Sequence, residues 1–155
     1  MADLVCNISK GQAVELYKRV KNGDPSACRM YLIPIAAGAV TDATLTDCDD
    51  FAAMITAGVT ELSTNGWNRK TIAAADLATL PAPDDTNNRY DVDMPDQTWT
   101  AVSSGTSTDL VLCYASVATP TNGQLQPIGV YDFAITPDGS DVVAQVNTAG
   151  YFRAS

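Results

Sequence analysis

Hydrophobic and polar residues alternate over residues 89–94, and this stretch gives the clearest sign of secondary structure in the chain. The apolar residues Tyr90, Val92 and Met94 are separated by one basic and two acidic residues. A period of two is typical of a half-buried strand. Acidic groups on one face and large apolar groups on the other predict an antiparallel sheet with one solvated face. A second short run follows at 97–102.

Further apolar runs predict most of the remaining sheet. Strands are expected at residues 29–35, 59–62, 110–115, 126–135 and 142–146. Pro34 lacks a ladder donor, so we expect the first of these strands to end there or to lie at an edge. The run at 110–115 is apolar on both faces, which favours a central position in the sheet.

One segment near the start of the chain has the spacing of an amphipathic helix. Ala13, Leu16, Tyr17 and Val20 fall on one helical face. The Asn-Gly-Asp-Pro cluster at 22–25 is a strong stop signal. We therefore predict a short helix before residue 22.

A second helix is predicted over residues 46–57. Thr46 is its expected N-cap, three aspartates in the first turn suit the helix dipole, and Gly58 is a natural stop. Phe51 and Ile55 are expected to face the core. The aspartates could instead bind a metal ion, but capping and the dipole explain them without one.

Residues 1–9 are predicted to form an N-terminal arm. Leu4, Cys6 and Ile8 alternate with the residues between them, so the arm could add as an edge strand, including to a neighbouring chain. Residues 10–155 are expected to form a single β-rich domain. Together these elements predict a mainly β, α+β fold: an antiparallel β-sandwich or barrel-like domain with one or two short helices.

Charge is sparse and unevenly distributed. Only 17% of the 155 residues are charged, below the usual share of about a quarter, as expected where partners cover part of the surface. The first thirty residues carry five basic and three acidic groups, whereas the rest carry four basic and fifteen acidic groups. This acidic body argues against nucleic-acid binding. Lys18, Arg19 and Lys21 form either a solvated helix face or a surface that docks on an acidic partner.

Residues that support catalysis or metal binding are few. The chain has no histidine, which removes the commonest general base and metal ligand. Asp91 and Asp93 would lie about 7 Å apart on one strand face, as carboxylates do in inverting glycosidases, yet many solvated strands share that spacing. The oxygen-rich stretch Asp84–Asp96 is a candidate calcium loop, although it lacks the glycine of an EF-hand. We predict a non-enzymatic protein without a cofactor.

Two aromatic positions are candidate binding surfaces. Trp67 is followed within three residues by a basic pair, which could contact nucleic acid, but an interface or core anchor is favoured. Tyr151, Phe152 and Arg153 lie at the end of the chain, where most domains are polar and loose. We expect this aromatic end to dock on its own sheet or on a neighbour.

Four segments carry a resemblance to known proteins. They are DDTNNR at 84–89, DMPDQTWTA at 93–101, DFAITPDGSD at 132–141 and AGYFRAS at 149–155, with weaker likeness at 10–11 and 22–25. These segments resemble a group of small virion structural proteins of tailed bacteriophages, of the capsid decoration or cement type. The resemblance supplies no catalytic residue.

The resemblance implies a protein that binds the outer surface of the major capsid protein lattice and stabilises the head. Such a protein would be made in the cytoplasm of the host bacterium and reside on the capsid surface. We expect a homo-oligomer, with a trimer favoured over a dimer because capsid lattices offer three-fold positions. Two alternatives stay open: a tail or head–tail connector protein, and a host-surface or glycan-binding module.

The four cysteines are expected to be reduced thiols. Their spacings match no zinc pattern, and the polar start of the chain does not read as a signal peptide. The longest apolar run, at 30–40, contains Pro34 and Gly38 and is too short to span a membrane. We predict that elemental analysis finds no stoichiometric zinc and that the intact mass shows no loss of two hydrogens per disulfide. Either signal would contradict this prediction.

Overall fold

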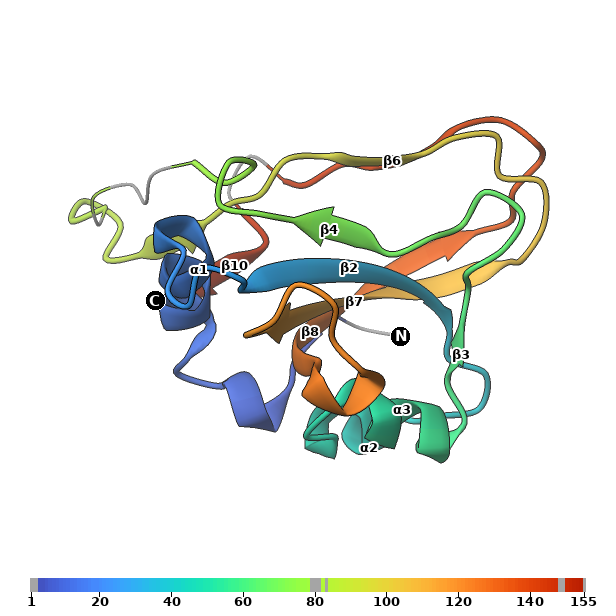
Figure 1. Cartoon of the computed structure of the whole chain (residues 1–155), viewed down its shortest axis with the longest axis horizontal. Helices are drawn as coiled ribbons and strands as arrows, with labels where there is room; N and C mark the ends of the chain where they lie inside the picture. Colours follow the sequence, from blue (N-terminus) through green and yellow to red (C-terminus); the bar gives the residue numbers. More distant parts are fainter. Residues whose placement is uncertain (1–2, 79–81, 83, 148–149, 155) are drawn as a thin grey trace.

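A six-stranded antiparallel sheet forms the centre of the protein (Figure 1). The computed structural model describes residues 3–78, 82, 84–147 and 150–154. The strand order is β1–β8–β7–β2–β3, and β4 also pairs with β2. These strands are β1 (Leu4–Val5), β2 (Arg29–Ala36), β3 (Thr60–Glu61), β4 (Lys70–Ile72), β7 (Ser107–Ala115) and β8 (Gln126–Ile135).

A second layer covers one face of this sheet. It consists of helix α1 (Ala13–Asn22) and two small antiparallel sheets, which pair β5 (Tyr90–Val92) with β10 (Phe152–Ala154) and β6 (Gln97–Trp99) with β9 (Val142–Ala144). Sheet residues such as Leu32 and Leu112 share a buried cluster with Trp99 of this layer. The strands of β6 and β9 lie above the central sheet in Figure 1.

Short helices cover the opposite face. They are η1 (Asn7–Ser9), α2 (Asp42–Asp47), α3 (Phe51–Ala57) and η2 (Asn122–Gln124). Ile33, Val111 and Val130 of the sheet form a separate buried cluster with Leu45 and Phe51 of these helices. The central strands are therefore buried on both sides, with α2 and α3 below the sheet in Figure 1.

The predicted fold class is confirmed: the chain is mainly β, with antiparallel sheets in a sandwich-like arrangement. The first predicted helix is also confirmed. α1 buries Ala13, Leu16, Tyr17 and Val20, and it ends at Gly23 in the left-handed conformation. The described residues form three α-helices, not one or two, because the second predicted helix is divided.

The division of the helix predicted over 46–57 has a local cause. Its N-cap is not Thr46, which lies inside α2. α2 is capped by Thr41, and α3 starts afresh after Asp50, whose side chain accepts a hydrogen bond from the Ala53 N–H at 2.7 Å. Ile55, expected to be buried, is 37% exposed. The seven-residue α3 meets the sheet through Phe51 and Met54, so Ile55, about 100° further round, faces away.

The expectation that β2 ends or lies at an edge at Pro34 is wrong. β2 continues to Ala36 in the interior of the sheet. The Pro34 carbonyl accepts a hydrogen bond from the Leu62 N–H at 2.9 Å, so the Pro34 nitrogen faces the same side. On that side β4 pairs with residues 30–32 and β3 with residues 35–36. Proline is tolerated because it faces the gap between these two short strands.

The N-terminal arm lies on the sheet of its own chain. β1 pairs antiparallel with β8, with Leu4 opposite Val130. The Cys6 N–H donates to the Ile128 carbonyl at 3.1 Å, and the Ser9 hydroxyl donates to the Pro127 carbonyl at 2.6 Å. The edge strand that the alternation predicted is therefore limited to Leu4–Val5, with the partner supplied by β8, and Asn7–Ser9 form η1 instead.

The contrast between Phe51 and Ile55 gives a test of the packing of α3. Phe51 is fully buried, so we predict that Phe51→Ala lowers the free energy of unfolding by about 3–5 kcal/mol. Ile55→Ala, on the outer side of the same helix, should cost less than about 1 kcal/mol. Urea unfolding followed by circular dichroism measures both. Equal losses for the two variants would contradict this orientation of α3.

Candidate functional site

Parts of the segments that carry the resemblance meet in the second layer. β6, from the segment 93–101, pairs with β9, with Trp99 opposite Val142. The turn after β8 joins the same assembly, because the Gly139 N–H donates to the Val102 carbonyl at 2.8 Å. β10, at the end of the chain, pairs with β5. Strands that are sixty or more residues apart in the sequence, β5 and β10, thus pair in this layer.

Gly150 is required where the last segment meets β5. It has a φ of +83°, and a Cβ there would collide with the backbone carbonyl of Val92. The next residue, Tyr151, donates its N–H to that carbonyl at 2.9 Å. A side chain at position 150 would therefore separate the end of the chain from β5.

Trp99 is the centre of the second layer. It is fully buried, and its indole N–H donates to the Asn68 carbonyl at 2.7 Å. Its ring lies 5.4 Å from the Trp67 ring in an edge-to-face arrangement, and the Lys70 ammonium lies 5.4 Å from the centre of the Trp99 ring. Trp67 itself is only 2% exposed. Because its ring is in the core, Trp67 does not contribute to the outer surface of this chain.

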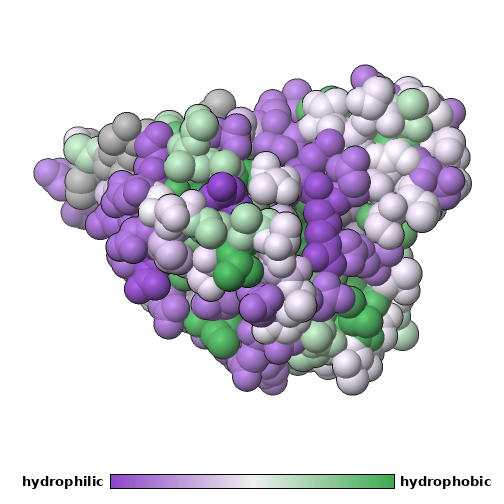
Figure 2. Space-filling model, in the orientation of Figure 1, coloured by the Kyte–Doolittle hydropathy of each residue, from purple (hydrophilic) through white to green (hydrophobic). Residues whose placement is uncertain are grey.

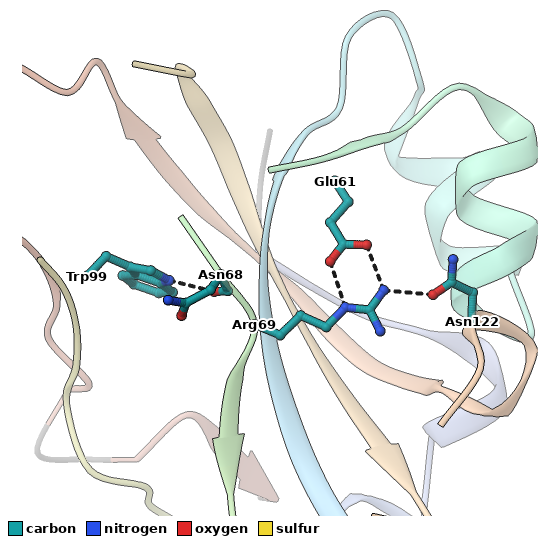
Figure 3. A network of polar contacts seen from close by, with 5 residues as sticks. All are labelled: Glu61, Asn68, Arg69, Trp99 and Asn122. Atoms are coloured by element: carbon teal, nitrogen blue, oxygen red, sulfur yellow. Dashed lines mark hydrogen bonds and ion pairs between the residues drawn. The ribbon is translucent and has the colours of Figure 1, made fainter. Parts of the chain in front are cut away.

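Arg69 forms a polar network with Glu61 and Asn122 (Figure 3). Its guanidinium donates two hydrogen bonds of 2.6 Å to the Glu61 carboxylate and a third of 2.7 Å to the Asn122 side chain. The guanidinium also lies 5.5 Å from the centre of the Phe51 ring. The network joins β3, η2 and α3. Sequence reasoning missed it, and the basic pair that could have contacted nucleic acid is engaged within the chain.

The other proposed interface residues near the N-terminus lie in different environments. Cys6 is fully buried, where desolvation raises the pKa of its thiol to about 12. Leu4 and Ile8 are half-buried and pack against the core. All four cysteines are buried, and none of them forms a disulfide. Of the three arm residues proposed as contacts, Cys6 is thus part of the core, whereas Leu4 and Ile8 are partly exposed.

The basic residues of α1 do not form one free patch. Lys21 donates to the backbone carbonyls of Leu77 at 2.6 Å and Ala74 at 3.3 Å. Arg19 makes an exposed ion pair with Glu15 at 3.3 Å. Lys18 is exposed. Two of the three cations are therefore used by the chain itself, and Lys18 faces solvent.

The aromatic end of the chain docks on its own fold. Tyr151 and Phe152 are half-buried and pack against the cluster around Trp99. The Arg153 backbone pairs with Asp91 of β5. Burial raises the pKa of the Tyr151 hydroxyl, with smaller contributions from Tyr131, Tyr17 and Asp93. The hydroxyl is buried and has no hydrogen-bond partner among the described residues.

The carboxylates of the proposed calcium loop are engaged locally. The Arg89 guanidinium lies 3.2 Å from the Asp84 carboxylate and 3.1 Å from that of Asp91. The Asp93 carboxylate accepts a hydrogen bond from the Met94 N–H at 2.8 Å. Within residues 3–78, 82, 84–147 and 150–154, no three His, Cys, Asp or Glu side chains gather as metal ligands would. The Arg89 guanidinium thus occupies the position that a metal ion would need in order to bind both Asp84 and Asp91.

In comparisons with known proteins, no family model, no curated protein and no solved structure matches this chain. None of the helices formed by the described residues has the length and apolar character needed to cross a membrane.

The Arg69 network gives a second test. Arg69→Met would leave the partly buried Glu61 carboxylate without its cation, so we predict a loss of about 2–3 kcal/mol in the free energy of unfolding. The matched control is Arg19→Met, which removes an exposed pair worth about 0.3–0.5 kcal/mol. Urea unfolding of both variants measures the difference. A loss at Arg69 no greater than that at Arg19 would show that the network does not stabilise the fold.

Proposed function

We propose that this chain is a non-enzymatic structural protein of a bacteriophage virion, of the capsid decoration or cement type. It would bind the outer surface of the major capsid protein lattice and stabilise the head. It would be made in the cytoplasm of the host bacterium, and it would act as a homo-oligomer, with a trimer favoured over a dimer.

The observation that carries this proposal is that parts of the resembling segments lie close together in the fold. Residues 93–101 contribute β6 to the second layer and the end of the chain contributes β10, and their partners β9 and β5 lie next to resembling segments in the sequence. The Ala101 N–H also donates to the Asp141 carboxylate at 2.9 Å, which joins two of the segments directly. Segments that lie close together in the fold can act as one surface, and this proximity supports the proposal.

The packing supports a structural role by a separate argument. Both faces of the central sheet are covered, and the two ends of the chain, β1 and β10, are tied into sheets. A protein that binds many equivalent capsid positions gains from such rigidity, because little conformational freedom is lost on binding and modest contacts add over many copies. Of the N-terminal residues considered for contacts, Lys18 and Arg19 are exposed, and Leu4 and Ile8 are half-buried.

The decisive experiment locates the protein in particles. We predict hundreds of copies per virion on the outer face of the head in an electron-microscopy map, with a matching stoichiometry by quantitative mass spectrometry. Six, twelve or a few dozen copies would place it in the connector or tail and contradict the decoration role. Absence from purified particles, together with a specific signal on a glycan array, would favour a host-surface binding module.

A further inference from the structure

A cavity of about 240 Å³ opens between the central sheet and the second layer. Its apolar walls come from both layers and consist of Leu32, Met94, Leu110, Phe133, Ala144 and Val146. An apolar cavity of about 150 Å³ is enough to hold benzene. The cavity therefore has room for the side chain of a phenylalanine or leucine.

The cavity lies beside the part of β8 that β1 leaves uncovered. β1 pairs with β8 only as far as Val130, and the next residues of β8, Tyr131 to Phe133, line the cavity. The Asp132 N–H donates to the Asp3 carboxylate at 2.8 Å, and this bond lies at the end of the pairing between β1 and β8. A group approaching the edge of the sheet would thus reach the cavity just beyond the arm.

The charge around the cavity has one sign. Asp3 and Asp132 are exposed and line it, and no lysine or arginine is among its described lining residues. If an apolar side chain of a partner entered the cavity, the partner residues next to it would lie against these two carboxylates. Basic neighbours would be attracted and acidic neighbours repelled.

We propose that this cavity is a socket for an aromatic or branched apolar side chain of a partner protein, in a segment where lysine or arginine flanks that side chain. Apolar anchors that fill a pocket inside a polar rim are typical hot spots of protein interfaces. The inference rests on the proposed function in one respect, that the chain works by binding other proteins. It adds the chemistry of the contact and the place where the contact is made.

The test uses three short probe peptides and two-dimensional NMR of the intact protein. The probes are acetyl-Lys-Phe-Lys-amide, acetyl-Glu-Phe-Glu-amide and acetyl-Lys-Ala-Lys-amide. We expect saturable shifts of the Phe133 and Gly150 amides with the first peptide and a dissociation constant about fivefold higher with the second, since exposed ion pairs contribute modestly. The alanine peptide should give no saturable shift at these amides.

Variants of the protein sharpen the test. Ala144→Leu fills the cavity from its wall and should abolish binding of the phenylalanine peptide. Because that variant could fail to fold, Asp132→Asn serves as a second one: its side chain is exposed, and the bond to Asp3 uses its backbone. It should reduce the preference for basic over acidic flanks. Asp85→Asn, an exposed aspartate that does not line the cavity, is the matched control and should change neither property.

Three outcomes would overturn the proposal. They are equal binding of the phenylalanine and alanine peptides, equal binding of the basic and acidic peptides, and binding of benzylamine at these amides without binding of any peptide, which would mark a small-molecule site. The peptides are tested on the isolated protein, whereas the virion role is tested by copy number in particles. Failure of the socket would therefore be distinguishable from failure of the decoration role.

Discussion

Burial of both faces of β7 is the constraint on which the rest of the fold depends. Leu110 and Leu112 face one buried cluster, while Val111 and Cys113 face the other. A strand with no solvated side requires a covering layer on each face of its sheet. The helices α2 and α3 provide one layer, and α1 with the two small sheets provides the other. Within the sheet β7 lies between β2 and β8, which also remove its two edges from solvent.

The two covering layers are held by different physical interactions. The helical layer packs through Leu45, Phe51 and Met54, and the Arg69–Glu61 ion pair ties its margin to β3. In the second layer, the two small sheets consist of strands of three residues, which are too short to be stable alone. The layer depends on Trp99, whose buried ring contacts Trp67 and whose N–H is satisfied by a backbone carbonyl. One large aromatic anchor thus compensates for weak strand pairing.

Local patterns predicted local structure well and long-range partners poorly. The spacing of apolar residues located α1 and β8, because periodicity depends only on neighbouring residues. The division between α2 and α3 was missed since Asp50 can cap or continue a helix, and packing on the sheet decides between them. The Arg69–Glu61 pair and the cavity beside Tyr151 depend on contacts across the fold. No spacing in the sequence reports those contacts, so pattern reasoning could not find them.

The internal use of cations determines what the surface offers to a partner. Lys21 binds backbone carbonyls, Arg69 binds Glu61, and Lys70 lies over the Trp99 ring. Arg89 is likewise held between two carboxylates. Hydrophilic and apolar residues are interspersed on the face drawn in Figure 2. With nine basic residues against eighteen acidic ones, a chain that engages several of its cations internally presents a surface on which negative charge exceeds positive charge. Such a surface repels further copies of itself at long range, so close contacts between copies need apolar or hydrogen-bonded groups, whereas a basic partner is attracted before any contact forms.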